Sequence, residues 1–429
     1  MKVYLADIGL ILMDITNALS NETAEIIYAK SFKYFARKSA TDFTRNRKMP
    51  FEEVMLFMLQ SLKCSTQSAL RRFFKMLNKP VFMQQQSFSE ARAKIKPEAF
   101  VRLFQLSAKI MAEHCRQTWY GFHVYAIDGS KIALPADKKL LAYFGGAGRN
   151  ATSPTAQASI AYDVLNDTVV DAQIAPLKTD ERTLAQQHLE ACREFTADGK
   201  KLFIFDRGYP SFELIEYLES NGFYYVMRVR EKFNLDIDAQ TDRDGYVGIV
   251  QGEKRLLIRV IKIQLDSGET ETLITNLKDI SLNPTAFKKL YFMRWPVETK
   301  YDVVKNKLQL ENFSARTVDG IKQDFYATMY LTNAAAAALA DAQAKIEEAR
   351  KDKNNKYQYH ANLNELIGVL KDQFILAVVE EDEAKGTAMI QNVIDEIVRS
   401  VTPTRPDRSV PRNPSPRKSK FHNNRKTNC

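Results

Sequence analysis

The chain has few of the residues that build zinc sites and disulfide frameworks. Its four cysteines lie far apart in 429 residues and form no C-x-x-C pair, so neither a zinc site nor a disulfide framework is predicted. They are Cys64, Cys115, Cys192 and Cys429. The five histidines show no metal-ligand spacing either, and we expect them to be structural or surface groups.

Long hydrophobic stretches are also missing. Away from the amino terminus the longest apolar run covers residues 334–340, far short of the roughly 20 residues that span a bilayer. At the amino terminus Asp7 and Asp14 interrupt the apolar residues, and no small-residue cleavage site follows. This pattern favours a folded segment over a signal peptide. We therefore expect a cytoplasmic protein without a membrane partner.

Acidic residues are outnumbered by basic ones. The sequence has 62 lysines and arginines against 52 aspartates and glutamates, a net charge of +10 with a pI near 9.1. Such a balance favours polyanionic partners, of which nucleic acid is the commonest. Residues 402–429 contain eight basic side chains against a single acidic one, Asp407. This segment is predicted to be a basic disordered tail, which is compatible with contacts to phosphates.

The rest of the chain has the composition of a folded protein. A hydrophobic fraction of 45% predicts a real core, and the length suits two or three domains. Residues 1–118 show helical patterns with many basic side chains. Two interpretations fit them: a DNA-binding domain with a helix-turn-helix reader, or a helical bundle with solvated lysines and arginines. We favour the DNA-binding interpretation.

From residue 119 the periodicity changes to that of strands. Strands and helices are predicted in the order β-β-β-α-β-α-β over residues 119–230. Residues 231–280 show strands separated by glycine turns, which predicts an all-β insertion. Residues 281–345 return to helix and complete the core, and residues 346–401 form a C-terminal helical region that is a candidate for dimerisation. The predicted fold class is therefore α/β, flanked by an N-terminal helical domain and C-terminal helices.

Two predicted strands each end in an aspartate. Asp128 follows a hydrophobic strand and precedes Gly129, and Asp206 follows a second one and lies two residues before Gly208. A single aspartate at a strand end is usually a turn former or a helix cap. Two of them on one sheet favour a functional site, because loop ends of strands are where functional groups are exposed.

A third acidic residue stands in a helical pattern. Tyr291, Arg294, Glu298 and Lys305 follow one another at offsets of three, seven and fourteen residues from the tyrosine. At about 100° per residue these offsets place the four side chains on one face of a helix. Pro296 should kink this helix or start a new one, which would place Glu298 in a first turn.

With these motifs the sequence resembles the insertion-sequence-four group of bacterial DDE transposases. The signature of that group, Y-x2-R-x3-E-x6-K, is matched at every spacing by residues 291–305. The Asp-Gly at residues 128–129 and the Asp-Arg-Gly-Tyr at residues 206–209 match the other two motifs. The resemblance covers residues from about 45 to 340, and Pro296 falls at a variable position of the signature.

The resemblance implies an RNase H-like catalytic core with residues 231–280 as the insertion domain. It implies that Arg294 and Lys305 contact terminal DNA phosphates, that Tyr291 helps to place the strand end, and that Arg207 is a further DNA contact. For Trp295 two interpretations stay open. Its indole could stack on an unpaired base, or it could be a core residue, which is the commoner situation.

The expected catalytic residues and metal ligands are Asp128, Asp206 and Glu298. Three carboxylates suit two Mg²⁺ or Mn²⁺ ions, which activate the attacking oxygen and stabilise the leaving one. The resemblance implies cut-and-paste transposition through a hairpin intermediate. The expected partners are the double-stranded terminal inverted repeats of the element, the target DNA and a second protomer, at least on DNA. We expect the protein in the bacterial cytoplasm, associated with the nucleoid when it binds DNA.

Other functions share some of these features. A catalytically inactive DNA-binding relative would be expected to show a substituted ligand, and none is visible in the sequence. The sequence distinguishes poorly between a transposase and an RNase H-fold nuclease that hydrolyses DNA without joining it. The tyrosine–arginine–glutamate–lysine set favours strand transfer. A glycosidase with paired carboxylates would share neither the basic charge nor the predicted strand order.

Overall fold

The computed structural model describes residues 14–404 except 46, 62, 81–82, 196–198, 266–267, 280, 352 and 354–356. The predicted amino-terminal folded segment up to residue 13 and the predicted tail beyond residue 404 lie outside the described residues. The contacts divide the chain into two compact units. The sheet unit comprises Cys115–Ile132 and Phe144–Val303, and the helical unit comprises Met1–His114, Ala133–Tyr143 and Val304–Cys429.

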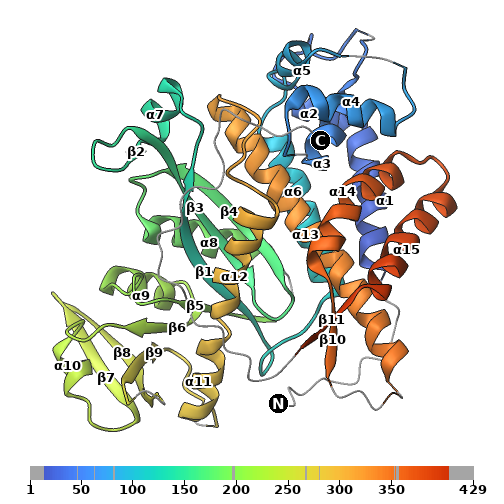
Figure 1. The fold of residues 1–429 in the computed structure, drawn as a ribbon. Helices are drawn as coiled ribbons and strands as arrows, with labels where there is room; N and C mark the ends of the chain where they lie inside the picture. The colour runs from blue at the N-terminus through green and yellow to red at the C-terminus, as the bar shows by residue number, and fades with distance from the viewer. Residues whose placement is uncertain are drawn as a thin grey trace. The chain divides into compact units, whose positions relative to one another are not determined.

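The centre of the sheet unit is a mixed sheet (Figure 1). Its core strands are β1 (Phe122–Ala133), β3 (Ser153–Asp163), β4 (Thr168–Pro176), β5 (Lys200–Phe205) and β6 (Tyr224–Val229). Antiparallel β4 and β3 form one side, β1 lies next to β3, and β5 and β6 continue in parallel with β1. Apart from α7 (Lys138–Phe144) and the short strand β2 (Gly146–Ala147), the elements follow the predicted β-β-β-α-β-α-β order. The predicted α/β fold class and the predicted order of its core elements are confirmed.

Helices cover both faces of this sheet because successive strand residues point to opposite sides. On one face, Tyr125 and Phe203 join a core cluster that includes residues of α8 (Glu181–Phe195) and α9 (Phe212–Ser220). On the other face, Val124 and Leu202 join a cluster that includes residues of α11 (Pro284–Phe292). A sheet buried on both faces explains why its strands are continuously hydrophobic.

The predicted insertion extends the same sheet. β7 (Asp244–Gln251), β8 (Lys254–Gln264) and β9 (Thr270–Thr275) pair antiparallel with one another, and β9 pairs with β6. These strands continue the sheet beyond β6 in the order β9, β8, β7, as Figure 1 shows. The prediction of an all-β segment missed the short helix α10 (Leu235–Ala239), which Asn234 caps by accepting from the backbone N–H groups of the first turn.

The helical pattern predicted over residues 291–305 is divided in the structure. α11 ends at Phe292, α12 (Trp295–Asp302) follows, and the π-helical turn η1 (Val303–Lys307) comes next. Pro296 occupies the first turn of α12, where its missing N–H costs nothing. The alternative in which Pro296 starts a new helix is therefore the right one, and Glu298 lies in its first turn.

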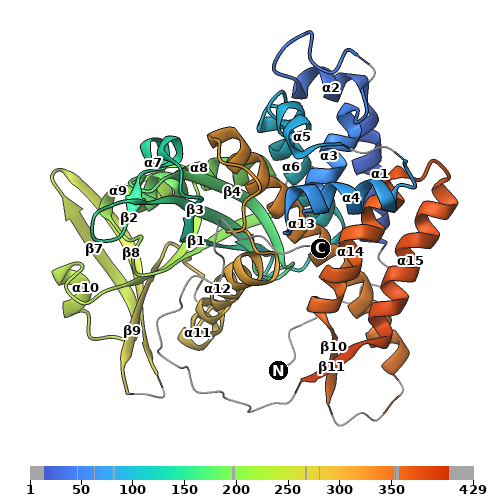
Figure 2. The same ribbon diagram turned by 45° about the horizontal axis from the view of Figure 1, so that its top comes forward.

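The helical unit contains the predicted N-terminal and C-terminal helices. They are α1 (Ile15–Tyr28), α2 (Lys30–Ala36), α3 (Phe51–Gln60), α4 (Thr66–Met76), α5 (Gln85–Arg92), α6 (Glu98–His114), α13 (Val318–Arg350), α14 (Leu363–Val379) and α15 (Glu383–Arg399). The alanine-rich α13 is buried along most of its length and packs against α6. α14 and α15 pack against each other (Figure 2). Within the C-terminal region, β10 (Gln358–Ala361) pairs antiparallel with β11 (Val401–Thr404), which the helical prediction did not include.

None of the helices in the described part of the chain combines the length and the apolar character that crossing a membrane requires.

Candidate active site

The two predicted aspartates lie on adjacent parallel strands. Ala126 of β1 is in register with Ile204 of β5, so Asp128 and Asp206 stand two residues further along in the same direction. Neighbouring strands are about 4.8 Å apart, which brings the two aspartates to the same place at the sheet. β1 continues to Ala133, so the prediction that this strand ends at Asp128 is wrong, whereas β5 does end directly before Asp206.

Local hydrogen bonds hold the turn after Asp206. One carboxylate oxygen of Asp206 accepts from the backbone N–H of Gly208 at 2.7 Å. On α8, the Arg182 guanidinium donates to the backbone carbonyl of Tyr209 at 2.9 Å. The conformation of the Asp-Arg-Gly-Tyr motif is therefore fixed both by its own aspartate and by the first turn of a neighbouring helix.

The backbone around Asp128 is held from two sides. Its carbonyl oxygen accepts from the Tyr301 hydroxyl of α12 at 2.9 Å and from the Ser159 hydroxyl of β3 at 3.3 Å. Ser159 also contacts Nε2 of the fully buried His188 at 2.9 Å, and Nδ1 of His188 contacts the Asp171 carboxylate at 2.6 Å. These groups satisfy one another's hydrogen-bonding capacity in the core, and the histidine is structural, as predicted.

The first turn of α12 brings Glu298 to the aspartates. Val297 is fully buried, and the buried Lys300 forms an ion pair of 2.5 Å with Asp167 in the turn between β3 and β4. Together with the bond from Tyr301 to the Asp128 carbonyl, these contacts seat α12 against the core strands. Glu298 is therefore positioned by three neighbours in its own helix.

Arg294 lies among the three carboxylates. Its side chain is 8% exposed and donates a hydrogen bond to Glu298 at 2.8 Å. Its guanidinium carbon lies 5.9 Å from the centre of the Tyr291 ring. Tyr291 itself is buried in the core cluster between the sheet and α11. The predicted common face is thus realised for Arg294 and Glu298, with Tyr291 packed behind the arginine.

The pKa of Asp128 responds to burial and to the charges of the neighbouring groups. Burial raises the pKa of the Asp128 carboxyl to about 7, Arg294 opposes this rise, and the charges of Asp206 and Glu298 add to it. Carboxylates that disfavour each other's ionisation in a partly buried place are a feature of functional sites. A divalent cation would relieve this repulsion.

The donor chemistry fits a hard cation such as Mg²⁺ or Mn²⁺, which prefers carboxylate oxygens. Among the described residues, however, the structure contains no group of three histidine, cysteine, aspartate or glutamate side chains that could hold a metal ion in their present positions. Glu298 is turned toward Arg294. This bond uses one of the two carboxylate oxygens of Glu298.

Two further groups near the aspartates were missed by sequence reasoning. A Cβ atom on Gly129 would lie 2.9 Å from Oε1 of Glu181 and 2.7 Å from Nε2 of Gln157, so the ends of these two side chains lie close to the backbone beside Asp128. Gln157 donates to the same Glu181 oxygen at 3.1 Å. Among the described residues, the buried hydroxyl of Tyr209 has no hydrogen-bond partner. Tyr209 stood in a recognised motif, whereas the place of Glu181 depends on how α8 packs on β3 and β4.

The other predicted DNA contacts have different surroundings. Trp295 is 47% exposed, so its interpretation as a core residue is wrong. Arg207 is exposed, and its backbone carbonyl accepts from Arg230 at 3.1 Å. Lys305 lies in η1 and belongs to the helical unit, not to the sheet unit that contains the three carboxylates.

Comparison with known proteins gives one family. The family model described as a transposase DDE domain matches residues 119–334. Among solved structures, the chain is similar to a piggyBac transposase in a cryo-EM structure of a synaptic complex with hairpin DNA. The TM-score is 0.43 at 9% identity, covering 94% of this chain and 85% of that chain. No curated protein sequence matches. Because the family model covers just over half of the chain and includes Asp128, Asp206 and Glu298, the chain belongs to the family of transposase DDE domains.

Proposed function

We propose that this transposase cleaves the ends of its own insertion sequence and joins them to target DNA, and that it is a member of the insertion-sequence-four group. What supports the proposal is that Asp128 and Asp206 stand at matching positions of two adjacent parallel strands, and that Glu298 lies in the first turn of α12. Their mutual effect on the pKa of Asp128 supports one shared site.

In this proposal Asp128, Asp206 and Glu298 hold two Mg²⁺ or Mn²⁺ ions. When bound, such ions supply activation of an oxygen nucleophile and stabilisation of the leaving oxygen in an in-line displacement at phosphorus. The chain itself orients the ligands, through the bonds of Tyr301 and Ser159 to the Asp128 carbonyl and of Gly208 to Asp206. Rigid support of this kind keeps ligands in a productive geometry.

Arg294 is proposed to exchange partners during the reaction. In the free protein its guanidinium holds Glu298. A terminal DNA phosphate offers the same guanidinium a bidentate anionic partner, so phosphate binding would release Glu298 toward the cations. Tyr291, packed against Arg294, would help to place the strand end through the arginine, because its own ring is mostly buried.

Three exposed or partly exposed groups are proposed as further DNA contacts. Arg207 and Lys305 would contact phosphates, and Trp295 would stack on an unpaired base. The 47% exposure of Trp295 supports stacking, because an indole face must be accessible to a base. An unpaired base is expected where a strand end folds into a hairpin, and we propose that excision uses such an intermediate.

The partners follow from this reaction. Double-stranded terminal repeats and target DNA are the substrates, and residues 1–118 are proposed as the DNA-binding domain. Since two ends must be brought together, we propose at least a homodimer on DNA, with residues 346–401 as a candidate interface. The protein would act in the bacterial cytoplasm at the nucleoid.

The test is cleavage of duplex DNA that carries the ends of the element. Wild type and Asp128→Ala are compared with Mg²⁺ or with EDTA, and Asp236→Asn, on the exposed face of α10, is the matched control. Metal-dependent nicking by wild type and the control alone supports the proposal, and hairpin products support the excision route. Tight binding without cleavage by any of the three would instead identify an inactive DNA-binding relative.

A further inference from the structure

A basic segment of the helical unit follows α3 and contains the next two helices. Residues 65–96, which contain α4 and α5, include seven basic side chains against one acidic side chain, Glu90. Among the basic ones, Arg72, Lys79 and Arg92 form ion pairs with Asp372, Glu53 and Asp324. The net positive charge of the segment favours a polyanionic partner.

A single aromatic ring joins the three helices. Phe57 of α3 makes edge-to-face contacts with Phe73 of α4 and with Phe88 of α5, at ring-centre distances of 5.4 and 4.7 Å. All three rings are buried. Such contacts are specific in geometry, so α4 and α5 are packed as one rigid piece against α3.

Two polar side chains fix the orientation of α5. Gln67 in the first turn of α4 donates to the carbonyl of Met83 at 3.0 Å and accepts from the N–H of Gln85 at 2.9 Å, which clamps the start of α5. At the other end the buried Arg92 donates to Ser314 at 2.6 Å and to Asp324 at 3.0 Å. The helix therefore cannot rotate, and the face opposite Phe88 and Arg92 is turned to solvent.

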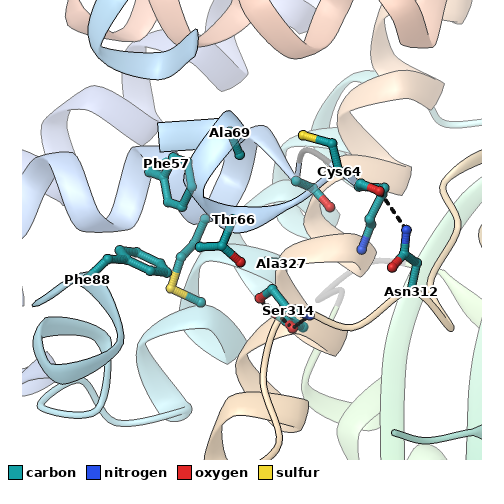
Figure 3. Close-up of a pocket in the computed structure, with 12 residues that line it drawn as sticks. Phe57, Cys64, Thr66, Ala69, Phe88, Asn312, Ser314 and Ala327 are labelled. Carbon is teal, nitrogen blue, oxygen red and sulfur yellow. Dashed lines mark hydrogen bonds between the residues drawn. The ribbon is translucent and has the colours of Figure 1, made fainter. Parts of the chain in front are cut away.

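The small cavity beneath these helices is not a binding site that would account for their basic side chains. Figure 3 shows it between Phe57, Thr66 and Phe88 on one side and Asn312 and Ser314 on the other. Its volume of about 30 Å³ admits water and nothing larger. The space is a packing gap inside the helical unit and not a ligand site.

The outward face of α5 carries side chains suited to base edges. Gln86, Ser87, Ser89 and Glu90 are all exposed. Glutamine can bond bidentately to adenine, glutamate accepts from cytosine, and serine bonds to either kind of group. On α4, Arg71 and Lys75 lie one helical turn apart and are exposed, where they can contact phosphates.

We propose that α5 is the base-reading helix of this transposase and lies in the major groove of the terminal repeat, while Arg71 and Lys75 of α4 contact the flanking phosphates. This inference rests on the proposed function and names the residues that recognise the element's ends. The connection over residues 77–84 is longer than the three- to four-residue turn of the usual helix-turn-helix. In this protein the hydrogen bonds of Gln67 to the backbone of Met83 and Gln85 hold the two helices together, as that short turn does elsewhere.

The experiment starts with selection of bound duplexes from a randomised pool by the full-length wild-type protein. Affinities for the selected duplex and for a scrambled duplex of equal composition are then measured for wild type, Gln86→Ala, Gln86→Ala/Ser89→Ala and Lys75→Gln. Gln187→Ala, an exposed glutamine of α8 in the sheet unit, is the matched control. Circular dichroism melts report whether each variant is folded.

Gln86→Ala is expected to lower the preference for the selected duplex by about 5- to 100-fold, the contribution of one good base contact, with unchanged affinity for the scrambled one. Lys75→Gln should weaken both equally and reduce the salt slope by about 1. Wild-type preference in both Gln86 variants, or a wild type that enriches no sequence, would overturn the inference. Mg²⁺-dependent cleavage by wild type is scored separately, so the transposase proposal can stand while this one fails.

Discussion

The guanidinium of Arg294 donates to the carboxylate of Glu298 across 2.8 Å, one helical turn away. The arginine is 8% exposed, whereas the side chain of Glu298 is 41% exposed. The arginine is therefore the more deeply buried member of the pair. Beside Asp128, whose carboxyl already resists ionisation, this ion pair balances the negative charge of Glu298.

Glu298→Gln should abolish cleavage and leave binding of end DNA intact, because the amide keeps the shape of the side chain but loses the anionic ligand. Cleavage is followed on labelled duplex with Mg²⁺, and binding by gel shift with Ca²⁺. Glu365→Gln, at an exposed position of α14, serves as the control. Retained cleavage in Glu298→Gln would remove this residue from the site.

The metal-free protein should lose stability as pH rises from about 4 to 7. The pKa of Asp128 is raised from 3.8 to about 7 in the folded state, so the unfolded chain releases its proton first, and ionisation then opposes folding. Asp128→Asn should therefore be more stable than wild type at pH 8, by on the order of 2–4 kcal/mol, and no more stable at pH 4.

Urea unfolding in EDTA at both pH values measures this difference. An advantage of Asp128→Asn that is equal at pH 4 and pH 8 would contradict the assignment of the raised pKa to Asp128. Addition of Mg²⁺ supplies a second readout, since cation binding should stabilise wild type at pH 8 and leave Asp128→Asn nearly unchanged.

Tyr301→Phe should reduce cleavage as well as stability. The hydroxyl of Tyr301 donates to the Asp128 carbonyl at 2.9 Å, and loss of such a bond costs about 1 kcal/mol. Tyr330→Phe is the matched control, because Tyr330 is buried in the helical unit and its hydroxyl lies 2.6 Å from that of Thr23. Similar stability losses with equal cleavage rates in the two variants would show that Tyr301 does not position Asp128.

Tyr209→Phe should be as stable as wild type or more so. No described residue bonds the buried hydroxyl of Tyr209, so removing it avoids a desolvation cost of roughly 1–3 kcal/mol. Tyr225→Phe offers the comparison, since the hydroxyl of the equally buried Tyr225 donates to Glu219 at 3.1 Å. Thermal melts measure the stability of both variants. A loss of stability in Tyr209→Phe as large as that in Tyr225→Phe would indicate that the Tyr209 hydroxyl has a hydrogen-bond partner.

Truncation after Thr404 should weaken non-specific DNA affinity and flatten its salt dependence, because the removed residues include all eight basic side chains of the tail. The cut keeps β11, which pairs with β10, so the C-terminal region should remain folded. Affinity for random duplex is measured between about 50 and 200 mM salt. An unchanged slope would mean that the tail does not contact phosphates.

Local pattern in the sequence determined the class of fold and the three carboxylates. Hydrophobic runs ending at residues 127 and 205 predicted the strands, since burial of apolar side chains forces such runs into a sheet. The spacing of Tyr291, Arg294 and Glu298 predicted the acidic helix, and Pro296 indicated the helix start that the structure confirms. All of these are short-range signals.

Only the tertiary structure decided which other groups stand at the site. Glu181 meets Gly129 because α8 packs on β3 and β4, and Tyr301 reaches the Asp128 carbonyl because α12 is seated on the sheet. The exposure of Trp295 and the attachment of the insertion strands to β6 also depend on packing. Contacts between residues far apart in the chain arise from how whole elements bury their apolar faces, and no local pattern carries that information.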